Sequence, residues 1–413
     1  MNITSKIVAL SSAVAFALQI ALALLMLRYF SPEEVGMFSV ISQIGFFWTT
    51  LALAQTPLRF LANHGASVFD DVRQAWVSSL KRFVWLSPIA SLAVWWSGLS
   101  FVNALLWALL LSLCQLTWML AQSMRLRMEG VCAQAGVRVL PPLMALLVAV
   151  AAVFMQWSGP ALLAAALLGY AVGAAWLLPS LLAYWQAKFE NESTKPDEVA
   201  LSSALQDPLH EAIASVSGDN RSAALRMAHT LADALLGTAI VVVWQRLYGA
   251  QETGWMAAPL RVMGFMPAVV HMAWAQVLLA QPQRVRANPM WVGLGGFACV
   301  ALLGTGCAVA LDLGWLGEQW RGVWPYLLPL VFWQGSACLV AAYSYLPFQT
   351  QSAHMYSWLC IGIATLQGGV LFIPIFTNLL LAPFSVFVVF SICSSMGLLG
   401  ICWWQRNLSK STR

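Results

Sequence analysis

Long apolar segments recur along nearly the whole chain, and their length restricts the fold more than any other feature of the sequence. An α-helix rises 1.5 Å per residue, so about 20 apolar residues cross the hydrocarbon core of a bilayer. Repeated segments of this length predict an all-α polytopic membrane protein with about 12 transmembrane helices. The expected spans are 7–28, 36–61, 83–102, 104–124, 131–155, 160–184, 223–247, 254–280, 290–311, 323–346, 357–376 and 380–403. The first is interpreted as an uncleaved helix rather than a signal peptide, because the other spans follow it.

The composition supports the same class. Of the 413 residues, 60% are hydrophobic and 9% are charged, whereas a soluble domain has about 45–50% apolar and about 25% charged residues. A water-soluble globule has no way to bury so much apolar surface, but lipid can solvate it. The 21 Trp residues are also typical of membrane interfaces. The net charge of +5 is therefore not interpreted as nucleic-acid binding.

The sequence carries no motif for a metal or a cofactor. The eight cysteines include no CxxC pair, and nearly all lie within apolar runs. Cysteine in such a run is a small buried hydrophobe rather than a disulfide or a metal ligand. The GLGG stretch at 293–296 lacks the Lys-Ser/Thr of a phosphate-binding loop. We expect no cofactor, no metal and no direct use of ATP.

One long hydrophilic segment divides the chain. It lies within 185–222 and separates six predicted spans from six others. This division is expected of two internal repeats or lobes around a central cavity. The predicted units are an N-terminal six-helix lobe at 1–184, a cytoplasmic linker at 185–222, a C-terminal six-helix lobe at 223–403 and a cytoplasmic tail at 404–413.

The basic residues predict the orientation in the membrane. If the N-terminus is cytoplasmic, 16 of the 21 Lys and Arg residues fall in cytoplasmic segments, and only Arg28, Arg246 and Arg321 fall on the opposite side. Arg138 and Arg261 fall within spans. Cytoplasmic loops carry an excess of Lys and Arg. Both termini and the linker are therefore predicted to be cytoplasmic.

Two short polar stretches follow the first span of each lobe. RYFSPEEVGMFS at 28–39 and RLYGAQETGWMA at 246–257 align without a gap, and the offset between them equals the lobe spacing. Locally, Ser31 is expected to cap the next helix, with Pro32 in its first position. A generic turn signal is the alternative explanation. The aligned identities are Arg28 with Arg246, Glu34 with Glu252 and Gly36 with Gly254.

These hairpins carry a resemblance to a known family. SPEEVGMFSV and its echo LYGAQETGWMAAPLRVMGF resemble the polysaccharide-transporter branch, which includes O-antigen flippases, of the multidrug/oligosaccharidyl-lipid/polysaccharide flippase superfamily. The second hairpin departs from the pattern, with Gly-Ala-Gln where the first has Ser-Pro-Glu.

The resemblance implies a V-shaped two-lobe transporter with a cationic central cavity in a bacterial inner membrane. It also implies alternating access, which moves an undecaprenyl-diphosphate-linked oligosaccharide, an O-antigen-like repeat unit used in lipopolysaccharide biosynthesis, from the cytoplasmic to the periplasmic leaflet. A polysaccharide polymerase and a chain-length regulator are then the expected protein partners.

A polar stripe runs along the seventh predicted span. Arg226, His229 and Asp233 recur at i, i+3 and i+7 and so share one face. Asp233 lies about 15 Å into the span. An acid at this depth is a candidate site for proton or sodium coupling, with His229 beside it. The alternative is a structural pair between Asp233 and an arginine, with Arg226 reaching the surface.

Two arginines lie deep within spans. Arg138 and Arg261 are each about 10 Å from the nearer end of their spans. A guanidinium forms paired, charge-assisted hydrogen bonds with phosphate, so both are candidates to bind the diphosphate. A buried pair with Asp233 is the alternative. Arg59 lies near the inner end of its span and is expected to contact the substrate diphosphate as it enters. A side chain that extends to the membrane interface explains its position equally well.

Glutamines within the spans complete the candidate site. Their amides can hydrogen-bond sugar hydroxyls, but they can also hold neighbouring helices together. The predicted substrate-binding residues are Arg261, Arg138, Arg59, Arg226, Gln19, Gln43 and Gln55.

Two other functions fit parts of the pattern. A cation-coupled multidrug exporter of the same superfamily would have the same fold, but two deep arginines against the single Asp233 favour an anionic substrate. A polytopic polysaccharide polymerase or ligase needs a sizeable external loop, and the longest one expected here runs only from about Asp312 to Arg321. We therefore expect a transporter rather than an enzyme.

The orientation can be tested by labelling. In a variant whose eight native cysteines are replaced by serine, a single cysteine at Ser193, in the predicted linker, is expected to react with membrane-impermeant maleimide only after the inner membrane is opened, because the charge bias places this segment in the cytoplasm. Labelling of Ser193→Cys in intact spheroplasts would reverse the assignment and favour the polymerase or ligase.

Overall fold

The structure, a computed structural model, describes residues 3–54, 56, 68–127, 131–157, 159–177, 220–275, 278, 288–350, 352–377 and 381–411. All regular structure in these ranges is helical. The elements are α1 (Ile3–Tyr29), α2 (Pro32–Leu53), α4 (Val68–Ser97), α5 (Phe101–Arg127), α6 (Val131–Phe154), α7 (Ala161–Ala175), α11 (Asn220–Val270), η2 (His271–Ala275), α13 (Pro289–Asp312), η4 (Glu318–Val323), α14 (Trp324–Tyr343), α15 (Leu346–Gln349), α16 (Ala353–Thr377) and α17 (Pro383–Ser411).

The prediction of an all-α polytopic membrane protein is confirmed. The described ranges hold eleven α-helices besides the short α15. Eight helical stretches are long and apolar enough to cross a membrane, and two shorter apolar ones are Val14–Tyr29 and Ala161–Ala175. The predicted lobe boundaries stay predictions, since most of the linker lies outside the described residues.

The second hairpin is shorter than the first. The predicted spans 223–247 and 254–280 both fall on α11, counted above as one element, but Gly249, with φ 84° and ψ 177°, divides it into two helices. A positive φ is readily adopted by glycine, so one residue is enough to end the first helix. The two arms of α11 therefore correspond to the two predicted spans.

The start of α2 follows the sequence prediction. Ser31 is the N-cap, and its hydroxyl accepts a hydrogen bond from the Glu34 backbone N–H at 3.2 Å. The Glu34 carboxylate accepts one from the Ser31 backbone N–H at 2.9 Å, which completes a reciprocal capping box. Pro32 occupies the first turn. The acidic residues of the first hairpin thus define where the second helix begins.

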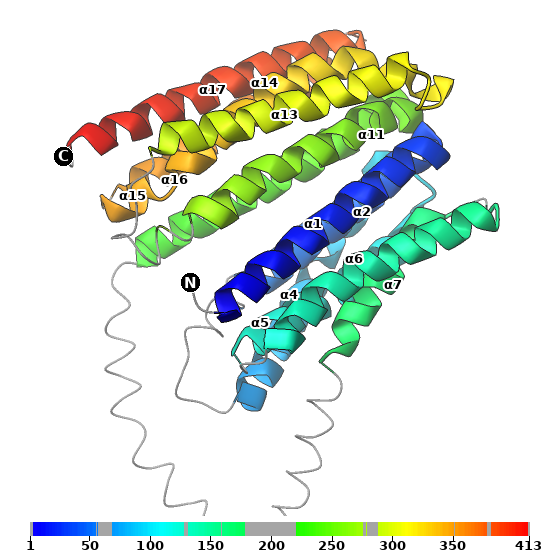
Figure 1. The fold of residues 1–413 in the computed structure, drawn as a ribbon, viewed down its shortest axis with the longest axis horizontal. Helices are drawn as coiled ribbons and strands as arrows, with labels where there is room; N and C mark the ends of the chain where they lie inside the picture. The colour runs from blue at the N-terminus through cyan, green and yellow to red at the C-terminus, as the bar shows by residue number, and fades with distance from the viewer. Residues whose placement is uncertain are drawn as a thin grey trace, which may run out of the picture.

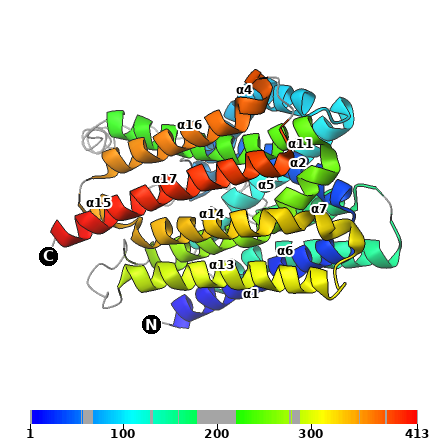
Figure 2. The same cartoon turned by 90° about the horizontal axis from the view of Figure 1, so that it is seen from above.

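The helices form two groups that lie side by side (Figure 1). Helices α1, α2, α4, α5, α6 and α7, here the N-terminal group, pack mainly against one another, as do α11, α13, α14, α16 and α17, the C-terminal group. The largest contact between the groups is that of α2 with α11. Seen from above, the helices of both groups run roughly along the same direction (Figure 2). The α2–α11 contact is therefore the seam of the molecule.

Two glycines set the spacing at this seam. A Cβ on Gly36 would overlap the backbone carbonyl oxygen of Ala250, and a Cβ on Gly254 would overlap that of Pro32. The contacts are reciprocal, because the alignment of the two hairpins that pairs Gly36 with Gly254 also pairs Pro32 with Ala250. Glycine lets two helix backbones approach closely. The two hairpins that match in sequence thus touch each other in the structure.

A segment of the C-terminal group covers the first hairpin. Trp320 Nε1 and Gln319 Nε2, both in η4, donate to the Phe30 carbonyl oxygen at 3.2 and 3.4 Å. Arg28 donates to the Trp315 carbonyl oxygen. Trp255 Nε1 on α11 donates to the Gln319 carbonyl oxygen at 2.8 Å. The bonds to Phe30 and from Arg28 fasten the two groups together at the hairpin end of the bundle, which is the end that carries Phe30, Gly249 and η4, and the Trp255 bond holds η4 against α11.

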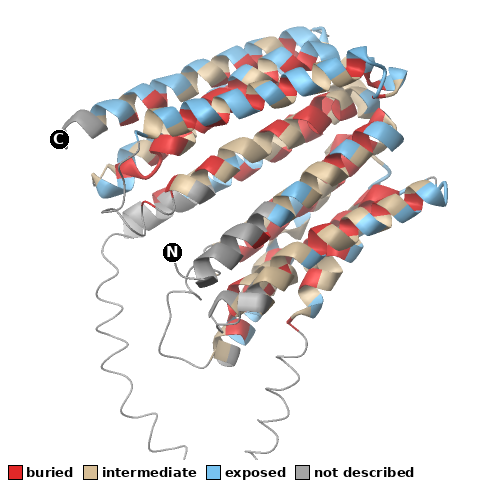
Figure 3. Ribbon diagram, viewed as in Figure 1, coloured by how far each residue is buried: buried red, intermediate tan, exposed pale blue. Residues whose placement is uncertain are grey.

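Buried and exposed faces alternate around the helices (Figure 3). Side chains at the seam are fully buried, including Val35, Ile44 and Val243 at 0% exposed. Large apolar side chains on the outside, such as Trp85 at 85% and Phe376 at 81%, are exposed. This distribution suits a bundle whose outer faces are solvated by lipid.

Alanine at either seam glycine is expected to destabilise the protein. Gly36→Ala and Gly254→Ala each force a backbone carbonyl to move, so each should cost roughly 1–3 kcal/mol of unfolding free energy and lower Tm in a thermal melt of purified protein. Gly295→Ala on α13 is the matched control, because nothing lies within 4 Å of its added Cβ. A Tm loss in the control equal to that of the seam variants would show that the close approach contributes nothing.

Candidate functional site

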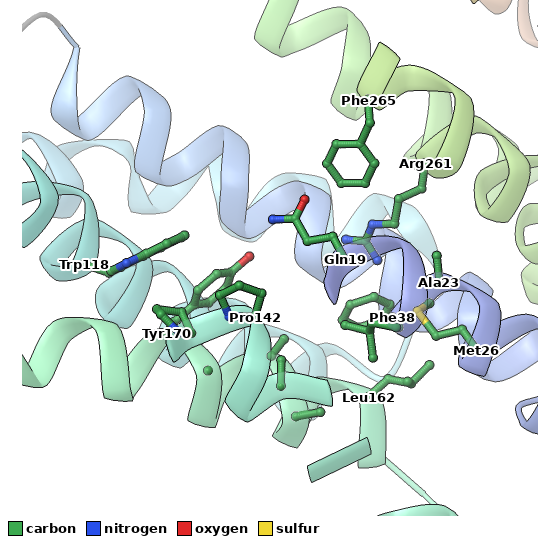
Figure 4. Close-up of a pocket in the computed structure, with 16 residues that line it drawn as sticks. Gln19, Ala23, Met26, Phe38, Trp118, Pro142, Leu162, Tyr170, Arg261 and Phe265 are labelled. Atoms are coloured by element: carbon green, nitrogen blue, oxygen red, sulfur yellow. The ribbon is translucent and has the colours of Figure 1, made fainter. Parts of the chain in front are cut away.

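A cavity of about 140 Å³ lies where α11 meets the N-terminal group. Gln19 on α1, Phe38 on α2, Trp118 on α5 and Tyr170 on α7 line it, together with Pro141 and Pro142 on α6. Arg261 and Phe265 enter from α11 (Figure 4). Arg261 is the one charged side chain among the described residues that line this cavity.

The surroundings of Arg261 leave its charge available. Its Nη2 lies 3.5 Å from the Ser42 hydroxyl oxygen, and its guanidinium carbon lies 4.6 Å from the centre of the Phe38 ring. Within the described part of the chain, no carboxylate forms an ion pair with it. A long hydrogen bond and a cation–π contact compensate a buried guanidinium less well than an anion would. An anionic group placed beside Arg261 would supply the compensation that the described residues lack.

The seam and the local sequence of α11 place Arg261. It follows the break at Gly249 by twelve residues, or about 18 Å along the helix. Pro259 and Pro267 lie on either side of it inside the helix. Each proline removes one helical hydrogen bond, a loss that neighbouring helices compensate in a membrane bundle. The tight contact at Gly254, two turns earlier, fixes the register that directs Arg261 toward α2.

Aromatic side chains form the far wall of the cavity. The Trp118 and Tyr170 rings stack with centroids 5.4 Å apart and an interplanar angle of 26°. Trp118 Nε1 donates to the Val137 carbonyl oxygen at 2.9 Å, which fixes the indole. A Cβ at Gly173 would overlap this indole, so the glycine leaves the space that it occupies. In the view of Figure 4, Gln19 projects between this aromatic pair and Arg261.

The predicted site residues fall into different places. Arg261 and Gln19 line the same cavity. Gln43 lies at the seam, where its carbonyl oxygen accepts from Thr238 Oγ1 at 3.5 Å. Arg138 is half-buried on α6, one turn before Pro141, but does not itself line the cavity. Three predicted candidates remain untested: Arg59 and Gln55 lie outside the described residues, as does the side chain of Arg226.

Asp233 and His229 form a pair one helical turn apart. Asp233 Oδ2 lies 3.1 Å from His229 Nε2, and the two side chains are 62% and 20% exposed. The His229 ring also packs edge-on against Tyr356 of α16, with centroids 5.6 Å apart. Asp233 shares its helix face with Gly237, which lies against Gln43 of α2. The coupling role of this pair stays a prediction.

Sequence reasoning did not identify the aromatic wall. Phe38, Trp118, Tyr170 and Phe265 lie within apolar runs, where an aromatic residue is ordinary packing or interface material. Trp118 and Tyr170 also come from different spans. No signal in the sequence separates them from the other aromatic side chains of this chain.

Comparison of the chain with known proteins gives matches among solved structures. No family model matches it, and no curated protein matches it either. Among solved structures, one match is "Lipid II flippase MurJ, inward closed conformation", with a TM-score of 0.61 and 11% identity over 98% of this chain and 87% of that one. Another is the inward-facing conformation of a multidrug resistance MATE family transporter of the MOP superfamily, with a TM-score of 0.45 and 13% identity over 100% and 97%.

The MurJ similarity spans nearly the whole chain, so this chain shares the helical fold of that structure.

Removing the acid of the Asp233–His229 pair is expected to leave the fold intact. Exposed pairs contribute about 0–1 kcal/mol to stability. Asp233→Asn keeps the side-chain volume, so its Tm should stay within a few degrees of wild type. Membrane yield and a thermal melt provide the measurement. A collapse in yield or Tm would instead assign Asp233 to a structural role.

Proposed function

We propose that this chain is a flippase for an undecaprenyl-diphosphate-linked oligosaccharide, an O-antigen-like repeat unit, in a bacterial inner membrane. The single observation that carries the proposal is Arg261. It is a guanidinium without a carboxylate partner in the described chain, and it lies in a cavity between two groups of helices. A charge held within a membrane bundle is costly, and a passing diphosphate offsets that cost. The MurJ-like fold supplies a scaffold suited to such transport.

The cavity favours an anionic substrate over a cationic drug. Its charged lining in the described residues is positive, so a cationic ligand would be repelled. This feature ranks the multidrug exporter second.

Transport by alternating access requires the two groups to separate at one end at a time. In this conformation the hairpin end is held closed by the bonds from η4 to Phe30 and by the seam glycines. Opening that end breaks a small set of hydrogen bonds and no described ion pair between the groups. Proton or sodium binding at Asp233 and His229 is the proposed source of energy. A polymerase and a chain-length regulator are the proposed partners.

Substitution of Arg261 tests the proposal. Lysine keeps the charge but loses the paired hydrogen bonds, and glutamine loses both. Flipping of a fluorescent polyprenyl-diphosphate sugar in reconstituted vesicles should therefore fall in the order Arg, Lys, Gln. The Gln variant should lose roughly ten- to hundredfold, as expected for a charge-assisted hydrogen bond of about 1.5–3 kcal/mol.

Arg246→Gln is the matched control, because Arg246 is an exposed arginine of the same helix. It should retain near wild-type flipping. Full activity of Arg261→Gln at normal protein abundance would contradict the proposal. If wild type exports a cationic dye and Asp233→Asn does not, the result would favour the multidrug exporter.

A further inference from the structure

The cavity has two chemically different ends. Arg261 supplies charge at one end, and the stacked Trp118 and Tyr170 rings form a wall at the other. Gln19 lies between them in the view of Figure 4. A site for a bare diphosphate would need only the first end. The aromatic end therefore indicates a second ligand group, one that packs against aromatic rings.

We infer that the Trp118–Tyr170 wall is a subsite for one sugar ring, the ring that is joined directly to the diphosphate. The inference rests on the proposed function and deepens it. A pyranose presents C–H groups on one face, and these pack against the electron-rich face of an aromatic ring. With the phosphate on Arg261, the attached ring extends along the cavity toward the aromatic wall.

Polar groups in the cavity match the hydroxyls of a sugar. The Tyr170 hydroxyl and the Gln19 amide line the cavity, and neither has a hydrogen-bond partner among the described residues. Both residues are partly buried and reach the cavity, and a tyrosine hydroxyl and a glutamine amide can each donate and accept. Sugar hydroxyls also do both, so a sugar ring satisfies these groups.

The same groups argue against a prenyl chain as the occupant. A hydrocarbon offers no hydrogen bonds and would leave Arg261, Gln19 and Tyr170 desolvated without compensation. The volume of about 140 Å³ further limits the occupant to a group much smaller than a drug-sized ligand. A single ring satisfies both limits, and the rest of the oligosaccharide must extend outside the cavity.

The wall is also held rigidly enough to act as a platform. The Trp118 indole is fixed by its hydrogen bond to the Val137 carbonyl and by the space that Gly173 leaves for it. A ring fixed before the ligand arrives loses little entropy on binding. This rigidity distinguishes Trp118 from the exposed Trp358 of α16.

Binding measurements with two probes test the inference. The probes are a polyprenyl diphosphate and the same lipid with one N-acetylglucosamine attached. Purified wild-type protein should bind the sugar-bearing probe roughly tenfold more tightly. Trp118→Leu should remove this gain while its affinity for the bare diphosphate stays unchanged. Trp118→Phe, which keeps an aromatic face, should retain most of the gain.

Two further variants separate this inference from the proposed function. Arg261→Gln should weaken binding of both probes to a similar extent. Trp358→Leu, the matched control at an exposed tryptophan that does not line the cavity, should change neither. If Trp118→Leu proves unstable in a thermal melt, Tyr170→Leu serves for the same comparison.

Three results would overturn the sugar subsite. The gain could persist in Trp118→Leu, or wild type could bind both probes equally, and either result removes the subsite while the diphosphate site remains. Alternatively, Trp118→Leu could weaken the bare probe as much as the glycosylated one, which assigns the wall to the prenyl chain. Failure of wild type to bind either probe refutes the proposed function, and the subsite with it.

Discussion

The close backbone contact between α2 and α11 is the constraint on which the rest of the structure depends. Gly36 and Gly254 each lie against a carbonyl oxygen of the opposite helix, so neither position has room for a side chain. The lipid around the bundle offers no hydrophobic driving force for helix association, so tight packing of small residues takes its place. The contact fixes both the distance and the register of the two groups. From that register follow the positions of Phe38 and Ser42 on α2 and Arg261 on α11.

The α2–α11 contact explains how the C-terminal group places a charged side chain in a cavity of the N-terminal group. Most of the cavity belongs to the N-terminal group, yet its charged residue comes from α11. The first arm of α11 runs toward the hairpin end, and the break at Gly249 directs the second arm back along α2. Because Arg261 lies two turns beyond Gly254, a sliding of α11 along α2 would move the guanidinium away from the aromatic wall. Any relative motion of the two groups therefore acts directly on the cavity.

Much of this fold could be predicted from the sequence, because bilayer thickness determines helix length and because Ser31, Pro32 and Glu34 form a recognisable capping box. The shortness of the connection at Gly249 could not, since a polar stretch with glycine usually predicts a longer loop than one non-helical residue. For the site, depth within a span identified Arg261 and Gln19 as candidates. Partners such as Trp118 and Tyr170 depend on long-range packing between α5 and α7. Hydropathy carries no information about that packing.

The internal repeat also indicates why the cavity is found on one side of the seam. The same sequence offset that relates the two hairpins pairs Gln19 with Gly237 and Gln43 with Arg261. On one side, Gly237 lies against Gln43, with 3.3 Å between the Gln43 Nε2 and a Cβ built at the glycine. On the other side, the equivalent residues Gln19 and Arg261 line the cavity. Close packing of Gly237 against Gln43 leaves little room for a ligand there. The Gln19–Arg261 side has both an open cavity and a positive charge. Among the described residues, the predicted repeat thus provides a similar helical framework on both sides of the seam, but Arg261 and the cavity on one side.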